Sequence, residues 1–242
     1  MEADFPMRIN KYLALRGHAT RRGADELIER GRVFINGRQA ALGDKVTEAD
    51  TVEVKTGKRG QKERSLYFAY NKPRGIITHS PGEGEQDIQD TLPELADSGV
   101  FPVGRLDKDS HGLLILTNDG RVTDRLLNPR HEHDKEYVVR TKLPLRKSFK
   151  THMEEGVLIE GYMTKPAKVR LMGDHTFSVT LTEGKKHQIR RMVVALHNEV
   201  ADLKRVRVLN VKLGKLKMGG TRPIEGAELD EFLALLGLKP VV

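Results

Sequence analysis

Two short amphipathic patterns and a hairpin pattern open the chain. Apolar side chains recur at helical spacing within residues 9–13 and again within residues 24–28, where Thr20 is placed to cap the second helix and Gly31 to end it. In the VFINGRQA that follows, Asn36-Gly37 separates two short strands, and this dipeptide is favoured by tight hairpin turns. This stretch therefore predicts a small unit of two helices followed by strands.

A polar segment separates this unit from the rest of the chain. TGKRGQKERS, residues 56–65, has no apolar residue and contains two glycines, which is typical of a flexible linker. We therefore divide the chain into an N-terminal domain of residues 1–58, a linker of residues 59–65 and a larger domain of residues 66–242.

Beyond the linker, short β-rich runs alternate irregularly with helical patterns. Strands are expected in LYFAYNK, GIITH, GLLILT, EYVVRT, AKVRLM, TFSVTLT and VRVLNVKL. Helices are expected in residues 86–98, 120–127, 145–154, 187–197 and 225–238. Because no regular strand–helix–strand repeat links them, the sequence predicts an α+β fold with a mixed, mainly antiparallel sheet and flanking helices.

The charge balance of the chain is basic. Among its 242 residues, 42 Lys and Arg stand against 34 Asp and Glu, which gives a net charge of +8. Such an excess is expected of a protein that approaches a polyanion, and in the small N-terminal domain it favours phosphate binding over a merely solvated surface. The side chains expected to meet phosphates there are Arg8, Lys11, Arg16, Arg21, Arg22 and Arg38.

Several classes of protein are excluded by what the sequence lacks. Without cysteine there is no disulfide, thiol nucleophile, iron–sulfur cluster or Cys-based zinc site. Neither a phosphate-binding P-loop, a dinucleotide fingerprint nor a G-x-S-x-G elbow occurs. No apolar run is long enough for a signal peptide or a membrane span, so we expect a soluble, cytoplasmic protein.

The stretch GRLDKDSHGLLILTNDG carries an Arg and an Asp just before a run of apolar residues. Asp107 fits the first position of a calcium loop, but Asn118 stands where that loop needs a bidentate Glu. The alternatives that stay open are an Asp in a polar turn and a catalytic carboxylate kept ionised by Arg105. A second metal candidate, formed by His131, His133 and Asp134, is equally compatible with a polar surface loop.

The same stretch is similar to the signature of the RsuA/RluB/RluE/RluF group of bacterial pseudouridine synthases. G-R-L-D, S-x-G-L-L and L-T-N-D-G occur in order, NKPRGIITH precedes them, and KEYVV and GKKHQIRRM follow. The N-terminal unit resembles the S4-type RNA-binding domain over about residues 7–54. The resemblance implies an S4-like domain attached to a synthase domain that isomerises uridine without metal, nucleotide or other cofactor.

The resemblance also implies roles for individual residues. Asp107 corresponds to the essential aspartate, which acts as nucleophile at the anomeric carbon, as base at the 2′ position or by attack on the pyrimidine ring. Tyr137 corresponds to the tyrosine that stacks under the uracil, and Arg190 to the basic residue that pairs with the aspartate. Arg105 is implied to fill the space left by the flipped nucleotide.

The remaining residues of the motifs divide into scaffold and substrate contacts. Gly104 and Gly112 are expected to serve the backbone conformation, and residues 113–116 to form the central strand. The side chains expected to contact phosphates of the substrate are Lys72, Lys185, Lys186 and Arg191.

We therefore expect a monomeric ribosomal RNA pseudouridine synthase, whose partner is ribosomal RNA or a precursor of a ribosomal subunit. KEYVV resembles the form found in large-subunit enzymes of the family more than that in small-subunit enzymes, and this resemblance favours 23S RNA. The segment LGKLKMGGTRPI near the C-terminus is not diagnostic of a target site. The alternatives are a noncatalytic RNA-binding or ribosome-assembly factor, a synthase acting on 16S RNA or tRNA, and a metal- or nucleotide-dependent RNA enzyme. The missing cofactor motifs oppose the last of these.

Overall fold

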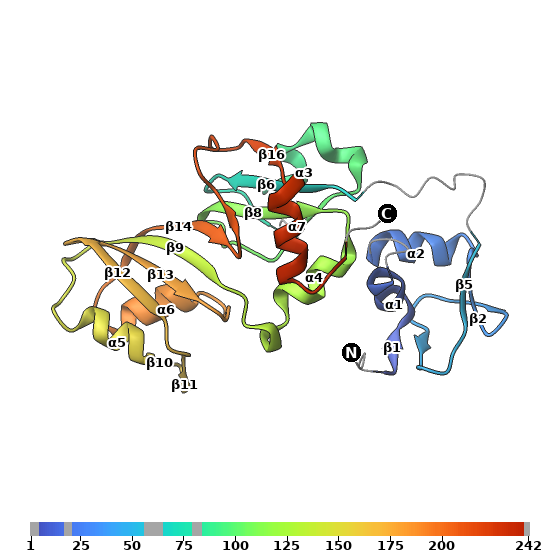
Figure 1. The fold of residues 1–242 in the computed structure, drawn as a ribbon, viewed down its shortest axis with the longest axis horizontal. Helices are drawn as coiled ribbons and strands as arrows, with labels where there is room; N and C mark the ends of the chain where they lie inside the picture. The colour runs from blue at the N-terminus through green and yellow to red at the C-terminus, as the bar shows by residue number, and fades with distance from the viewer. Residues whose placement is uncertain (1–4, 17–20, 56–64, 79–83, 240–242) are drawn as a thin grey trace.

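The computed structural model describes residues 5–16, 21–55, 65–78 and 84–239. The chain forms two parts, one on each side of residues 56–64 (Figure 1). The N-terminal part contains β1 (Met7–Arg8), α1 (Ile9–Leu15), α2 (Arg21–Glu29), β2 (Val33–Ile35), β3 (Arg38–Gln39), β4 (Lys45–Val46) and β5 (Val52–Val54). It has its own hydrophobic core, in which Ile9 and Leu13 of α1 pack with Ala24 and Ile28 of α2.

The predicted helix end and hairpin of the N-terminal part are confirmed. Gly31 follows α2 with φ of +65°, the left-handed conformation that ends many helices. Asn36 and Gly37 have φ of +50° and +80°, as the turn between two tightly connected strands requires. The predicted cap Thr20 lies outside the described residues.

The C-terminal part is built on a nine-stranded sheet with the order β12-β13-β9-β14-β8-β6-β16, to which β7 and β15 add at the side. Its strands are β6 (Tyr67–Lys72), β7 (Phe101–Val103), β8 (His111–Thr117), β9 (Lys135–Thr141), β12 (Lys168–Gly173), β13 (Thr176–Leu181), β14 (Val200–Val208), β15 (Val211–Lys212) and β16 (Thr221–Pro223). All pairs are antiparallel except β8 with β14, which is parallel. The predicted mixed, mainly antiparallel sheet is therefore confirmed.

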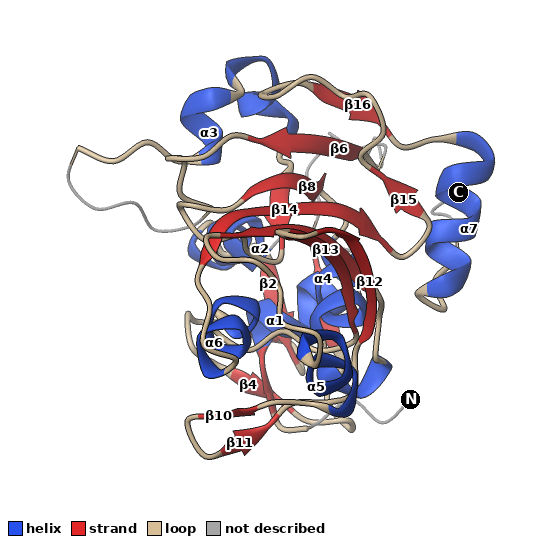
Figure 2. Cartoon of the chain, turned by 90° about the vertical axis from the view of Figure 1, so that its left-hand side faces the viewer, coloured by secondary structure: helices blue, strands red, loops and turns tan. Residues whose placement is uncertain are grey.

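Helices cover the sheet on both faces (Figure 2). They are α3 (Ile88–Thr91), α4 (Gly120–Leu127), α5 (Phe149–Glu155), α6 (Gln188–Ala195) and α7 (Gly226–Leu235), with 3-10 turns at Pro93–Ser98 and Pro129–His131. Along β8, Leu113 and Ile115 pack with α4 and α7, whereas Leu114 and Leu116 pack with α3. Every residue of β8 is buried, as expected for a central strand covered on both faces.

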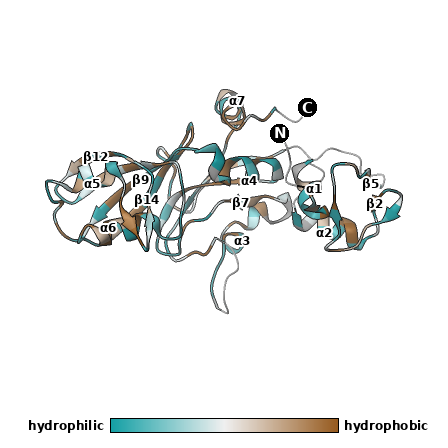
Figure 3. Ribbon diagram, turned by 90° about the horizontal axis from the view of Figure 1, so that it is seen from below, coloured by the Kyte–Doolittle hydropathy of each residue, from teal (hydrophilic) through white to brown (hydrophobic). Residues whose placement is uncertain are grey.

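The other half of the sheet has a separate core. There α5 and α6 pack on one face of β9, β12, β13 and β14, and Phe149 meets Phe177 edge to face with ring centroids 4.9 Å apart. The hairpin of β10 (Leu158–Ile159) and β11 (Tyr162–Met163) extends from this layer. Seen from below, this layer and the N-terminal part lie at opposite ends of the molecule (Figure 3).

The structure corrects two strand predictions. Of GIITH, residues 75–78 are described and form only an isolated bridge from Ile77 to Asp87, because the chain turns at Gly75 with φ of +87°. VRVLNVKL divides into the end of β14 and β15, with a turn at Leu209 and Asn210, and β14 begins already at Val200. The polar side chains of residues 200–205 concealed that beginning.

The two parts of the chain touch through α1 and α4. A Cβ at Gly120 would lie 3.1 Å from the carbonyl oxygen of Ala14, so the first turn of α4 rests directly on the end of α1. No helix among the described residues is both long and apolar enough to cross a membrane.

Asp119 holds the start of α4. Its carboxylate accepts the backbone N–H of Arg121, the hydroxyl of Tyr67 at 2.8 Å and the Arg121 guanidinium at 2.7 Å. Burial by itself raises the pKa of Asp119, but the hydrogen bonds from Arg121 and Tyr67 outweigh it, so the pKa lies below its ordinary value of 3.8. The Asp of the L-T-N-D-G motif is thus a helix cap.

Asp119→Asn should lower the free energy of unfolding at neutral pH by about 1–3 kcal/mol, because the cap loses its charge. The stabilisation by a carboxylate with a lowered pKa is complete above the ordinary value of 3.8 and is lost as the pH falls through the folded-state pKa. The wild-type advantage should therefore shrink below about pH 4. Urea unfolding of both proteins across this range measures it.

Asp124→Asn is the matched control, since it makes the same charge change in the same helix. Among the described residues, the Asp124 carboxylate has no hydrogen bond or ion pair. Equal losses of stability in the two variants would contradict the capping role of Asp119.

Candidate active site

Asp107 lies in the loop of residues 104–110, between β7 and the buried strand β8. Gly104 opens this loop with φ of +82°, and a Cβ there would lie 3.0 Å from the side chain of Leu127. The backbone N–H of Ser110 donates to the carbonyl of Asp107 at 3.0 Å and closes a turn. The loop is thus fixed at both ends, while the Asp107 side chain is 38% exposed.

Lys72, at the end of β6, stabilises this loop from beneath. Its ammonium group donates to the carbonyl oxygens of Pro73 at 2.9 Å, Asp107 at 3.3 Å and Ser110 at 3.0 Å. Burial lowers the pKa of Lys72 to about 8, against the charges of Asp107 and Asp109, which raise it. The expected phosphate contact is therefore corrected: Lys72 is fully buried, and backbone carbonyls take its donors.

In the described part of the chain, the Asp107 carboxylate faces the side chain of His187, a residue that the sequence analysis did not single out. His187 Nε2 lies 3.4 Å from Asp107 Oδ1. The expected pair of Asp107 with Arg190 is not formed among the described residues, because Arg190 Nη2 donates to Ser110 Oγ at 3.2 Å. Arg190 therefore holds the end of the same loop, and both contacts come from the first turn of α6 and the residue before it.

A buried network fixes the turn that leads into α6. Glu183, 7% exposed, accepts the hydroxyl of Tyr162 at 2.6 Å, the backbone N–H of Lys165 at 3.0 Å and the amide of Gln188 at 2.6 Å. The side chain of Gln188 also accepts the backbone N–H of Lys185 at 2.9 Å. The start of α6 is therefore held in place by groups outside the helix.

Tyr137 and Arg205 belong to the strands behind the loop. In register, Arg205 of β14 lies between Tyr137 of β9 and Gly112 of β8. Its guanidinium donates to the carbonyls of Leu113 at 2.7 Å and Arg105 at 3.5 Å, and its Nη2 has no partner among the described residues. Tyr137 itself is half-buried and packs on the core of α5 and α6.

Gly112 allows β8 and β14 to approach closely. Its φ is +102°, and a Cβ there would lie 2.3 Å from the carbonyl oxygen of Arg205. The expected backbone role of Gly104 and Gly112 is thus confirmed, and no other residue type fits at Gly112 without movement of the backbone.

A further polar cluster joins β14 to the start of β8. Asp202 accepts a hydrogen bond from His111 Nε2 at 2.8 Å and pairs with Arg74. Burial raises the pKa of Asp202, but hydrogen bonds from Arg74 and His111 outweigh this effect and bring the pKa below its usual value. Sequence reasoning missed this cluster because its members are far apart along the chain.

The other expected substrate contacts differ in exposure. Arg105, Lys185 and Lys186 are exposed, although the Lys185 ammonium lies over the Tyr162 ring, 4.5 Å from its centroid. Arg191 is half-buried and pairs with Glu160 at 2.9 Å.

In the N-terminal part, the cations expected to bind RNA are mostly accessible. Arg8, Arg16 and Arg21 are exposed, and Lys11 is half-buried. Arg38 is exposed but pairs with Asp44 at 2.8 Å. The side chain of Arg22 lies outside the described part of the chain.

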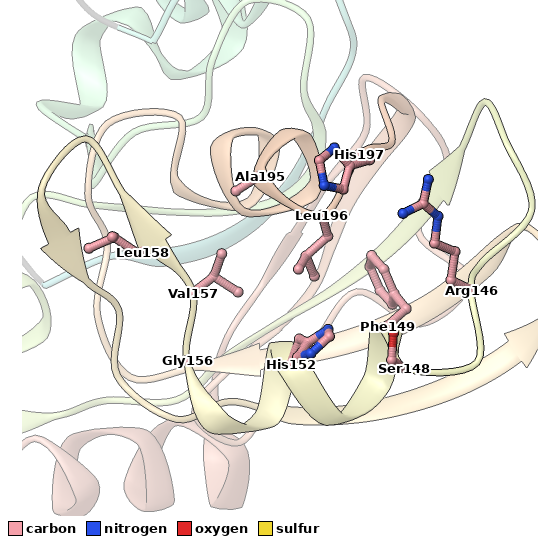
Figure 4. A pocket seen from close by; sticks show the side chains of 10 residues that line it. All are labelled: Arg146, Ser148, Phe149, His152, Gly156, Val157, Leu158, Ala195, Leu196 and His197. Atoms are coloured by element: carbon pink, nitrogen blue, oxygen red, sulfur yellow. The ribbon is translucent and has the colours of Figure 1, made fainter.

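Neither the metal candidate nor the cavity at the far end of α6 coincides with Asp107. His131 and His133 stack with centroids 5.7 Å apart, and the described ranges contain no cluster of three possible metal ligands. A cavity of about 390 Å³ lies at the far end of α6, between Phe149, His152 and His197 (Figure 4). None of the predicted catalytic residues lines it.

Comparison with known proteins follows the two parts of the chain. The family model described as RNA pseudouridylate synthase matches residues 66–195, and the S4 domain model matches residues 7–52. The chain is 38% identical to the dual-specificity RNA pseudouridine synthase RluF of Escherichia coli, over 98% of this chain and 81% of that protein. It is 36% identical to the ribosomal large subunit pseudouridine synthase B of Bacillus subtilis, over 94% and 96%.

A solved structure agrees with this similarity. A crystal structure of a pseudouridylate synthase superimposes with a TM-score of 0.69 at 29% identity, covering 93% of this chain and 99% of that one. The likeness therefore includes the N-terminal part as well as the large sheet.

Lys72→Met should leave the salt dependence of RNA binding unchanged, because a buried ammonium bonded to carbonyls releases no counterion from RNA. Lys186→Met is the matched control, with the same change at an exposed position. If Lys186 meets a phosphate, its loss should lower the slope of log Kobs against log salt by about 1. Fluorescence anisotropy with labelled RNA at several salt concentrations measures both slopes.

A Lys72→Met slope that fell as far as the Lys186→Met slope would show that Lys72 becomes accessible and reaches a phosphate. That result would contradict the role of Lys72 beneath the loop.

Proposed function

Because the chain belongs to the RNA pseudouridylate synthase family, we propose that it converts one uridine of ribosomal RNA, in the 23S molecule, to pseudouridine. The observation that carries the proposal is the position of Asp107: an accessible carboxylate on a loop fixed by buried groups. The name of the Bacillus subtilis relative, a ribosomal large subunit synthase, supports the choice of RNA.

The reaction needs a carboxylate, an aromatic side chain that stacks on the base, and cations. The bond from N1 of uracil to the anomeric carbon breaks, the base rotates, and a bond from C5 to that carbon forms. The C5 proton leaves and N1 gains a proton, so the product is an isomer of the substrate. Asp107 acts on the ribose or the base, since a carboxylate serves as nucleophile or as base at neutral pH. Tyr137 stacks under the uracil and assists removal of the C5 proton.

The two arginines of the site have supporting roles. Arg190 holds the loop through Ser110 and supplies positive charge close to Asp107. Arg105, which is exposed on the same loop, occupies the stack that the flipped uridine leaves.

The proposed domain division assigns affinity to residues 1–58 and chemistry to residues 66–242, joined by residues 59–65. Arginines of the S4 domain bind phosphates of folded RNA, and the larger domain takes the single uridine from an exposed loop or junction. We further propose that the protein acts as a monomer in the cytoplasm.

The RNA target is identified by mapping pseudouridine chemically in a strain that lacks the protein. The proposal expects one 23S site to lose its signal and to regain it when the gene is restored. Loss of a 16S or tRNA site instead would overturn the choice of 23S. Unchanged maps in all three RNAs would favour a noncatalytic assembly factor.

Asp107→Asn should abolish detectable pseudouridine formation, a loss of at least about 10³-fold, because the amide keeps the shape of the side chain without its charge or basicity. RNA affinity should stay within about threefold of wild type, since no phosphate contact is removed. Asp109→Asn, exposed in the same loop, is the control and should keep the wild-type rate. Near-normal turnover by Asp107→Asn would end the aspartate mechanism.

Replacing Arg8, Arg16 and Arg21 together by Gln should lower the slope of log Kobs against log salt by about 2–3, because three accessible cations leave the S4 surface. Arg38→Gln should change the slope little, since Asp44 already neutralises that guanidinium. Salt titrations of RNA binding give the values. Identical slopes in the triple variant and the wild type would exclude this face as an RNA-binding surface.

A further inference from the structure

His187 adopts a backbone conformation that is uncommon for residues other than glycine. It is the residue before α6, with φ of +54° and ψ of +26°, in the left-handed region that favours glycine and asparagine. Residues at this position commonly use their side chain to cap the helix, but His187 makes no such hydrogen bond. Its imidazole is directed at Asp107 instead, with Nε2 3.4 Å from Oδ1.

The surroundings of His187 determine this conformation. Gln188, the next residue, is buried and tied to Glu183, and its backbone N–H donates to the carbonyl of Lys185 at 3.1 Å. The carbonyl of His187 accepts the N–H of Arg191 as the first bond of the helix, at 3.0 Å. Backbone strain that neighbouring groups impose in this way is characteristic of functional sites.

Of the basic side chains around Asp107 in the described part of the chain, His187 is the one that reaches its carboxylate. Arg190 is engaged by Ser110, and Lys72 lies beneath the loop with its donors on carbonyl oxygens. The distance from His187 Nε2 to Asp107 Oδ1 is 3.4 Å, close enough for the ring to limit how the carboxylate is oriented. A half-exposed carboxylate without such a partner has several rotamers open to it.

We propose that His187 is a positioning residue for Asp107: its imidazole holds the carboxylate in the orientation from which it acts on the substrate. The inference rests on the proposed function, since Asp107 must be the reactive group. The side chain of His187 makes no hydrogen bond that caps α6, and the left-handed backbone brings its ring to the loop. Arg190 and His187 thus share the task, one fixing the loop and the other the side chain.

The experiment compares His187→Gly with His197→Gly. Glycine accepts the left-handed backbone without strain, so the substitution removes the imidazole while leaving the turn. His197 is the matched control: it is exposed, lies just after the other end of α6 and also has a positive φ, of +60°. Single-turnover rates and RNA dissociation constants are measured for both variants, with and without added imidazole.

We expect His187→Gly to lower the single-turnover rate by about 10–100-fold, as misplacement of a reacting group does. The RNA dissociation constant should stay within about threefold of wild type, and added imidazole should restore part of the rate. His197→Gly should match wild type. A full rate in His187→Gly, a loss that imidazole does not relieve, or a loss that comes from weaker RNA binding would each overturn the proposal.

A second readout keeps this test separate from that of the proposed function. The imidazole resonances of His187, assigned by their absence in His187→Gly, should shift in Asp107→Asn but not in Asp109→Asn. This NMR comparison needs no substrate. A wild-type protein inactive on every RNA would therefore refute the proposed function, whereas unshifted resonances would refute the contact with Asp107.

Discussion

The parallel pairing of β8 with β14 is the constraint on which the site depends. At Gly112 the two backbones approach so closely that a side chain would overlap the carbonyl of Arg205. This approach joins the half of the sheet covered by α4 and α7 to the half covered by α5 and α6. The loop before β8 and the first turn of α6 come from different halves, so Asp107 and His187 meet only because the strands between them are in this register.

Two cationic side chains, of residue types that normally face water, are buried here and hold the backbone through hydrogen bonds. Lys72 and Arg205 are both buried, and both donate to carbonyl oxygens of the loop or of the strand that follows it. A buried cation is tolerated where carbonyl oxygens take its donors, and it then orders the backbone that provides them.

Much of the fold followed from local patterns in the sequence. The run of residues 113–116 predicted a central strand because both faces of β8 are buried, and Asn36-Gly37 predicted its hairpin because a two-residue turn is a local property. The beginning of β14 was missed because Asp202, Lys204 and Arg205 interrupt the apolar alternation, and only contacts with distant segments explain their burial.

The site was predictable in part. That Asp107 lies in a loop before a buried strand could be inferred, since turn residues precede an apolar run. The residues that contact this loop could not be inferred. Lys72 was expected at the surface because lysine is seldom buried in the protein interior. Whether Arg190 contacts Asp107 or Ser110 depends on where α6 begins. The left-handed backbone of His187 has no signal in the sequence, because its cause is the buried pair of Glu183 and Gln188.

The contact of Gly120 with Ala14 has a consequence for how such proteins diverge. Residue 120 lies outside the loop that carries Asp107, yet a methyl group there would come within 3.1 Å of the carbonyl oxygen of Ala14, so α1 or α4 would have to shift by a few tenths of an ångström. Such a shift would move the two parts of the chain slightly against each other while each kept its own core. A substitution at residue 120 can therefore change the contact between the two parts, as related chains diverge, without touching either core.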